Sequence, residues 1–160
     1  MSNKKIIIGR EEWCAFPTLG IPAIKARVDS GAKTSCMHAF NIHTTMYGSR
    51  KWVSFEAHPV QKNRKITIRC KAKVIDRRAI KSSSGHIEKR YVIQLPMQIG
   101  SYVWEIELTL TNRDSMGYRM LLGREAMTDR VLIDPAISCR LGDIHYEKFI
   151  ALYPQKKPRS

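Results

Sequence analysis

Alternation of apolar and polar residues constrains the fold of this chain more than any other feature. Residues 66–74 read Ile-Thr-Ile-Arg-Cys-Lys-Ala-Lys-Val, and residues 104–110 read Trp-Glu-Ile-Glu-Leu-Thr-Leu. A period of two is typical of a strand that buries one face, and the exposed face of residues 66–74 is strongly basic. Shorter strands are expected over residues 6–16, 40–45, 51–55 and 131–133, with turns at 19–22 and 98–101. Only residues 124–129 have a helical composition, with a further turn near 34–37. The pattern predicts a mostly β chain, folded as a barrel or a sandwich.

The composition is that of one globular domain. The chain has 160 residues, of which 43% are apolar, so it can bury a substantial core. We expect a domain over residues 1–150 and a basic, proline-containing, disordered tail over residues 151–160. No apolar run approaches the roughly 20 residues that span a bilayer, and the first residues do not resemble a secretory signal. A cytoplasmic location without membrane contact is therefore expected. The cysteines are widely spaced and are expected to be free thiols: Cys14, Cys36, Cys70 and Cys139.

The charge is strongly unbalanced. Lysine and arginine number 28 and aspartate and glutamate number 14, which gives a formal net charge of +14. Such a field attracts polyanions. Nucleic acid is the usual partner of so basic a domain, but a run of glutamates is a polyanion too. Charge alone does not separate the two.

An aspartate follows an apolar strand near the N-terminus. Residues 23–28 run directly into Asp29-Ser30-Gly31-Ala32. A carboxylate there can handle a water molecule and its proton, a neighbouring hydroxyl can brace the loop, and glycine allows a close backbone approach. Any strand-to-turn junction also favours these residue types, so the segment by itself is weakly diagnostic.

A second segment makes the first more specific. Residues 120–127 read Met-Leu-Leu-Gly-Arg-Glu-Ala-Met, in which a short buried strand, a close-packing glycine (Gly123) and a helix start (Arg124) follow one another. The Asp-Ser-Gly-Ala loop and the Leu-Gly-Arg segment, in this order, are similar to the catalytic loop and the C-terminal strand-helix segment of retroviral-type aspartic peptidases.

The resemblance extends over nearly the whole chain. Residues 25–39, 82–93 and 107–127 resemble the bacterial retropepsin-like aspartic peptidases associated with ribosomal-protein glutamate ligases (the RimK/RimB type), which catalogues call ATP-dependent zinc proteases. The similarity spans residues 7–141. One departure is that Ser30 stands where threonine is more usual, and serine keeps the hydroxyl.

The resemblance implies a retropepsin-like closed β barrel with one short C-terminal helix, and a catalytic loop of Asp29, Ser30 and Gly31. Peptidases of this type use two carboxylates that share one proton, since like charges so close cannot both ionise cheaply. One draws a proton from water and the other polarises the scissile carbonyl. With one motif per chain, a homodimer would supply Asp29 twice across its axis, and Ser30 would brace the opposite loop. The fallback is a monomer that uses Asp134, for which capping the turn before Pro135 is the more ordinary role.

Residues 80–93 are expected to form a hairpin with a small tip at 82–85, which in the retropepsin plan is the flap that closes over substrate. The predicted substrate-binding residues lie on the catalytic loop, the flap and the helix start: Ala32, Lys33, Ser83, Ser84, Gly85, His86, Arg90 and Arg124.

The charges around the loop favour an acidic substrate. Many viral relatives carry an acidic residue at the position of Lys33, where it pairs with the arginine that corresponds to Arg124. Two cations cannot form that pair, so both are available to substrate carboxylates. Lysines and an arginine on the flap add to the field: Lys81, Lys89 and Arg90. The alternatives are that these are solvated surface charges, or that Arg124 pairs with Glu125 or Asp114. The resemblance implies a link to glutamate tails on ribosomal protein. Together with these charges, it gives the poly-glutamate tail of a modified ribosomal protein as the expected substrate.

No cofactor or metal is expected. There is no H-E-x-x-H motif, the five histidines are scattered, and the glycines do not form a phosphate-binding loop. Cys36 lies near the catalytic loop, but a small buried thiol is its expected role.

The main rival is a non-catalytic basic β barrel that binds nucleic acid or the ribosome. The net charge, the basic residues at 69–73 and the aromatic-cation runs at 50–52 and 89–91 support it. It does not explain the two peptidase-like segments. A basic face could also dock the enzyme on a ribosome.

Overall fold

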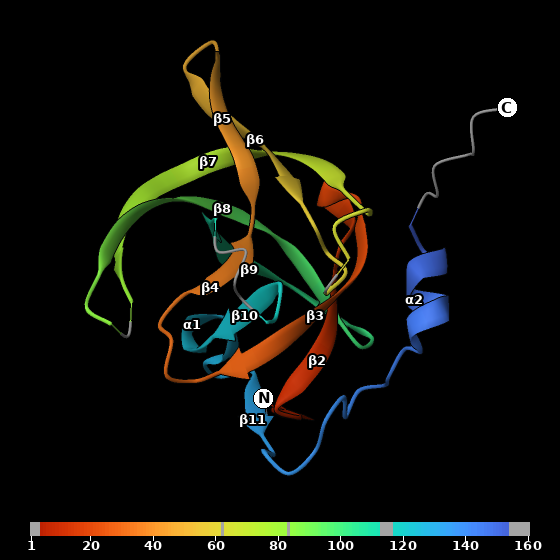
Figure 1. The fold of residues 1–160 in the computed structure, drawn as a ribbon. Helices are drawn as coiled ribbons and strands as arrows, with labels where there is room; N and C mark the ends of the chain where they lie inside the picture. Colours follow the sequence, from red (N-terminus) through yellow and green to blue (C-terminus); the bar gives the residue numbers. More distant parts are fainter. Residues whose placement is uncertain (1–3, 62, 83, 113–116, 154–160) are drawn as a thin grey trace, which may run out of the picture.

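The computed structural model describes residues 4–61, 63–82, 84–112 and 117–153 (Figure 1). The strands are β1 (Ile6–Ile8), β2 (Glu11–Phe16), β3 (Ile21–Asp29), β4 (Ser35–His38), β5 (Phe40–Tyr47), β6 (Arg50–Ala57), β7 (Ile68–Lys81), β8 (Ile87–Ile99), β9 (Tyr102–Thr111), β10 (Met120–Gly123) and β11 (Val131–Ile133). The helices are η1 (Pro17–Leu19), α1 (Arg124–Met127) and α2 (Tyr146–Ala151). The prediction of a mostly β chain is confirmed.

The main sheet closes on itself. Among the described residues, its strands follow the order β2-β3-β10-β4-β9-β8-β7-β6-β5. A further pairing sets Cys14 of β2 opposite Ile99 of β8, so the six strands from β2 to β8 form a ring. Strands β7, β6 and β5 continue outward from this ring, and Figure 1 shows the β5–β6 hairpin projecting from the body. A separate two-stranded parallel sheet joins β1 to β11.

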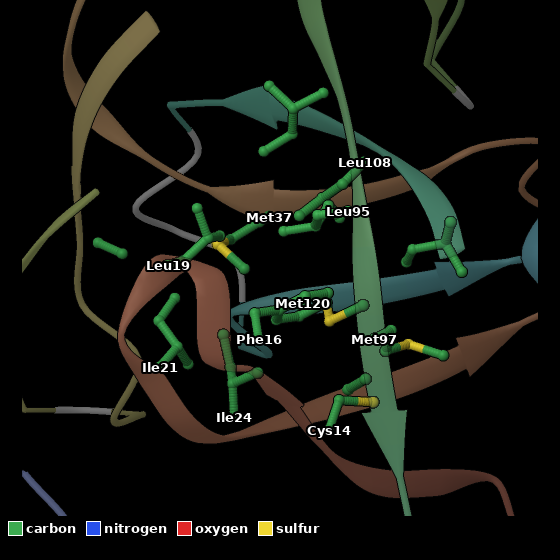
Figure 2. Packing of buried hydrophobic residues seen from close by; sticks show 14 of the residues in the cluster. Cys14, Phe16, Leu19, Ile21, Ile24, Met37, Leu95, Met97, Leu108 and Met120 are labelled. Carbon is green, nitrogen blue, oxygen red and sulfur yellow. The ribbon is translucent and has the colours of Figure 1, made fainter. Parts of the chain in front are cut away.

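Strand β10 comes late in the chain but lies in this ring between two strands from the N-terminal part. It lies between β3, to which it is parallel, and β4, to which it is antiparallel. A parallel neighbour needs a long crossover connection, and here the crossover contains most of the barrel. A small apolar cluster includes Ala23, Val60, Ile66, Phe149 and Tyr153. The main apolar core is filled by residues between Ile8 and Met127. Figure 2 shows part of it: Cys14, Phe16, Leu19, Ile21, Ile24, Met37, Leu95, Met97, Leu108 and Met120.

One strand prediction and one turn prediction are wrong. Residues 6–16 form two strands in different sheets, because the strand is interrupted at Arg10. The N–H of Arg10 donates to Ile137 O at 2.8 Å, and its carbonyl accepts from Val28 N at 3.0 Å. The predicted turn near 34–37 is largely the central strand β4, whose four residues are all buried. A strand buried on both faces has no polar alternation to reveal it.

The C-terminal part also differs from expectation. Helix α2 was not predicted, and its Phe149 packs edge-on against Trp13 with ring centroids 4.6 Å apart. Tyr153 is buried and donates a hydrogen bond to Ala23 O, so residues 151–153, which we had assigned to the tail, belong to the packed structure. Residues 154–160 lie outside the described part of the chain. Neither α1 nor α2 is long enough to cross a bilayer, and no other described helix is.

A buried carboxylate fixes the segment that leads to α2. Glu12 is fully buried and accepts hydrogen bonds from three backbone N–H groups, those of Gly9 at 2.6 Å, Arg140 at 2.9 Å and Leu141 at 3.1 Å. Charge-assisted bonds of this kind are stronger than neutral ones. Glu12 therefore ties residues 140–141 to β2.

Candidate active site

The aspartate that the sequence singled out stands at the end of β3. Asp29 pairs in register with Gly123 of the parallel strand β10. Its Oδ1 accepts a hydrogen bond from Gly31 N at 3.0 Å, and its backbone carbonyl accepts from Ala32 N at 3.2 Å. These bonds turn the chain sharply after the strand, and Asp29 remains partly exposed.

Gly123 packs directly against the far end of the same loop. A Cβ atom on it would lie 2.6 Å from Thr34 C and 2.9 Å from Ser35 N, closer than any side chain allows. Its N–H bonds Ser35 Oγ at 3.0 Å, and the Ser35 carbonyl accepts from Thr109 Oγ1 at 2.9 Å. The loop is therefore held at both ends by β10.

The start of α1 holds the middle of the loop. The backbone N–H of Arg124 donates to Ala32 O at 2.8 Å, and its Nη1 donates to Gly31 O at 3.1 Å. The N–H of Glu125 donates to Lys33 O at 3.1 Å. These three bonds fix the position of the aspartate loop relative to the helix.

The charges at this point differ from expectation. Lys33 is not without a partner, because its Nζ lies 3.8 Å from Glu125 Oε1, although both side chains are largely exposed. Arg124 uses Nη1 on the Gly31 carbonyl and is not ion-paired with Glu125. Asp114, the other suggested partner, lies outside the described residues.

A cleft of about 1010 Å³ lies over the aspartate loop. The loop, α1, β10 and the inner side of β7 line it. Six of the predicted site residues are on its wall: Asp29, Gly31, Ala32, Lys33, Arg90 and Arg124. Other predicted residues are not on the wall, namely Ser30, Ser84, Gly85 and His86, and Ser83 lies outside the described residues.

The predicted flap is a hairpin of β7 and β8. The strands pair up to Lys81 and Ile87, and Ser82 N donates to His86 O at 2.8 Å across the tip. Figure 1 shows the hairpin arching from the barrel. Ile80 and Lys81 of β7 and Ser82, the first residue of the predicted tip, line the cleft, whereas Ser84 and Gly85 do not.

Arg78 is a cleft residue that our sequence analysis missed. It lies opposite Arg90 in the β7–β8 pairing, and both side chains line the cleft. Its Nη1 and Nη2 bond the two oxygens of Glu107 at 2.5 and 3.2 Å, and its Nε bonds Asp76 Oδ2 at 2.6 Å. The hydrogen bonds from Arg78 hold the pKa of Glu107 below its usual value. Extending the predicted strand of residues 66–74 by alternation would have reached Arg78 and Ile80, and this pattern was the signal in the sequence that could have identified Arg78.

The other candidates take structural positions. Asp134 is not on the cleft wall, and its Oδ1 accepts a hydrogen bond from Ala136 N at 3.0 Å, which is the turn-capping role. Cys36 is a buried cysteine on the cleft wall and forms no disulfide bond, and Cys14 and Cys70 are also buried and form none. Burial raises the pKa of Cys14, and that of Cys70, to about 12.

Comparison with known proteins gives a consistent result. A family model described as RimB-like, "Retropepsin-like aspartic endopeptidase RimB", matches residues 7–139. Relatives described as "Probable alpha-L-glutamate ligase" are 61% identical over 98% of this chain in Shewanella halifaxensis and 57% identical over 97% in Desulfotalea psychrophila. The matched region is 35% and 33% of those proteins, so this chain spans about a third of their length.

A solved structure shares the fold. A protein from Legionella pneumophila, described as having unknown function, superposes with a TM-score of 0.73 over 87% of this chain and 100% of its own. Its sequence is 24% identical.

The close contact at Gly123 predicts a stability effect. Gly123→Ala should lower the free energy of unfolding by about 1–3 kcal/mol, because the new methyl group meets backbone atoms that cannot move aside. Chemical denaturation would measure it. The matched control is Gly117→Ala, where a Cβ meets nothing within 4 Å, with an expected change within about 0.5 kcal/mol. Equal effects of the two substitutions would contradict the role of Gly123.

Proposed function

Because this chain belongs to the RimB-like family of retropepsin-like aspartic endopeptidases, we propose that it is a peptidase that cuts acidic, glutamate-rich tails. The observation that carries the proposal is the placement of Asp29. Its loop is fixed by Gly123 and Arg124 at the base of a cleft large enough for a peptide. We expect the substrate to be a glutamate-tailed ribosomal protein.

The reaction requires a second carboxylate beside the first. In the proposed mechanism, the ionised carboxylate takes a proton from water while the oxygen of that water attacks the scissile carbonyl carbon. The protonated carboxyl group donates a hydrogen bond to the carbonyl oxygen. The tetrahedral intermediate collapses when the leaving nitrogen is protonated, which gives a new carboxyl group and a new amine. Among the described residues on the cleft wall, Asp29 is the one aspartate, whereas Glu107 is held by Arg78 and Glu125 lies 3.8 Å from Lys33. In the proposed mechanism the second carboxylate is therefore Asp29 of another copy of the chain.

An exposed apolar surface beside the site supports a homodimer. The register of the β1–β11 sheet sets Ile7 opposite Leu132, and their exposed fractions are 42% and 54%. Ile133 and Ile137 are also exposed nearby in the sequence. Arg10, two residues after β1, bonds Val28 directly before Asp29, so this surface is close to the catalytic loop. A two-fold axis here would bring two aspartate loops together.

The charges of the cleft support an acidic substrate. Five cationic side chains line it, Lys33, Arg78, Lys81, Arg90 and Arg124, against three carboxylates, Asp29, Glu107 and Glu125. Arg78 holds Glu107 in a two-pronged pair, and a substrate carboxylate could exchange with Glu107 on the same guanidinium. The name of the curated relatives refers to glutamate ligation. A domain that trims glutamate tails would reverse such an addition.

Asp29→Asn should abolish cleavage and leave binding intact. We would incubate each protein with a peptide that ends in several α-linked glutamates and identify the products by mass spectrometry. We expect the rate to fall at least about 10³-fold, because an amide cannot accept the proton of water. The control is Ser30→Thr, which keeps the hydroxyl and should remain active. Cleavage by Asp29→Asn at the wild-type rate would refute the aspartate mechanism.

Arg78→Gln should remove selectivity for glutamate. We expect kcat/KM for a glutamate-ended peptide to fall about tenfold, from the loss of charge-assisted hydrogen bonds, while kcat/KM for a glutamine-ended peptide changes little. Arg77→Gln is the matched control, because Arg77 is exposed and lies against the Tyr91 ring with its guanidinium 5.3 Å from the centroid. An equal fall in kcat/KM for both peptides would show that Arg78 stabilises the flap and does not select the glutamate side chain.

A substitution on the apolar surface tests the dimer. Leu132→Asp should raise the dimer dissociation constant at least about tenfold in sedimentation and lower the activity in parallel, because a buried, unpaired carboxylate is costly. Val103→Asp, at a side chain with 63% exposure in another part of the fold, is the control. In addition, excess Asp29→Asn protein should inhibit the wild type through mixed dimers. A fully active, monomeric wild type would contradict the shared site.

A further inference from the structure

The first half of β7 carries a surface that the proposed peptidase does not use. The pairings Thr45–Trp52–Lys73 and His43–Ser54–Lys71 align side chains of β5, β6 and β7 on one face. On β6 the opposite face is buried at Val53, Phe55 and Ala57. We call the outward side the β5–β7 face and define it by Tyr47, Arg50, Trp52, Lys71 and Lys73.

Aromatic rings and ammonium groups are interleaved on the β5–β7 face. Lys71 Nζ lies 4.1 Å from the centroid of the Tyr47 ring and 5.5 Å from that of Trp52, and it donates to Tyr47 Oη at 2.6 Å. Lys73 Nζ lies 5.7 Å from the Trp52 centroid. The Tyr47 and Trp52 rings meet edge-on with centroids 6.1 Å apart. Tyr47 is 51% exposed although it is a large aromatic residue.

The cations of this face have no ion-pair partner within the described part of the chain: no carboxylate there pairs with Arg50, Lys71 or Lys73. Glu56, an acid on the same side of β6, is already engaged by Asn41 and lies 3.6 Å from Arg69. The face therefore contributes uncompensated positive charge to a chain whose net charge is +14.

We propose that the β5–β7 face binds single-stranded RNA. Lysines alone would bind any polyanion, but exposed aromatic rings beside them can also stack on the bases of a nucleic acid. At an exposed site the cation–π contact is weak, so a base can take the place of an ammonium group over Tyr47 or Trp52. The displaced lysine, on its flexible stem, then reaches a neighbouring phosphate. A single strand can offer its bases to these rings, whereas a duplex keeps its bases stacked inside.

The site is separate from the cleft. Strand β7 contributes Lys71 and Lys73 to the β5–β7 face, whereas its residues from Arg78 onward line the cleft. Figure 1 shows the β5–β6 hairpin at the top of the view and α1, which lines the cleft, in the lower part of the barrel. RNA binding on this face would place the peptidase on a ribonucleoprotein and leave its cleft free.

The test is fluorescence anisotropy with a labelled oligouridine of about 12 nucleotides, at salt concentrations between about 50 and 200 mM. We expect saturable binding with a dissociation constant of about 1–10 μM at low salt. Lys71→Gln with Lys73→Gln should weaken binding about tenfold and reduce the slope of log affinity against log salt by about 1.4, or about 0.7 per phosphate contact. Lys5→Gln with Lys148→Gln removes the same charge elsewhere and should weaken binding by less than about threefold.

A second pair of variants tests stacking. Tyr47→Leu should weaken binding about fivefold or more, whereas Tyr47→Phe, which keeps the ring, should stay within about twofold of the wild type. Unfolding midpoints of all variants would confirm that they are folded, and trimming of the glutamate-ended peptide should persist in each. Four results would overturn the proposal: absence of saturable binding, equal losses in the two lysine pairs, equal losses in the two Tyr47 variants, or tighter binding of a duplex. Displacement of the RNA by poly-glutamate at equal charge concentration would also overturn it, in favour of an acidic-peptide dock.

Discussion

The parallel pairing of β3 with β10 is the contact on which the candidate site depends. It sets Gly123 beside Asp29, and from that point the backbone of α1 bonds the carbonyls of the loop. The close packing of Gly123 on Thr34 leaves no room for a side chain, so the register cannot shift without a clash. One interaction thus fixes the aspartate, the loop after it and the start of the helix together. The barrel supplies the frame that keeps the two strands adjacent.

The positive charge of the molecule serves two different environments. In the cleft, Arg78 and Arg90 each have an acidic partner, in Glu107 and Glu88, so binding an acidic ligand there is an exchange between carboxylates. On the β5–β7 face, the partners of the lysines within the described part of the chain are aromatic rings and the hydroxyl group of Tyr47. The first environment favours discrimination between ligands, since an incoming group must replace an existing pair. The second favours fast encounter with a polyanion, which depends on salt.

Much of the fold and part of the site could be predicted from the sequence. Strands such as β7 and β9 could be predicted because apolar and polar residues alternate in them. The Asp29 loop and Gly123 could be predicted because their geometry requires particular residue types. Strand β4 lacked that signal because both its faces are buried. Helix α2 is only six residues long and owes its place to packing on Trp13, a contact with no local signature. The partners of Lys33 and Arg78 depend on which strands become neighbours, and the linear pattern of charges does not contain that information.

The aspartate loop and the segment that holds it are far apart in the sequence, and this separation has a consequence for biosynthesis. The bond between Gly31 and Arg124 spans 93 positions, and the residues between them form most of the barrel. On the ribosome, the aspartate emerges before the segment that shapes its loop, and most of the barrel is made between the two. Contacts of such long range also form late in folding, because the loop they close is costly in entropy. Maturation of the barrel and assembly of the aspartate loop are therefore one event, and a truncated chain that ends before Gly123 carries the aspartate without the geometry that would make it reactive.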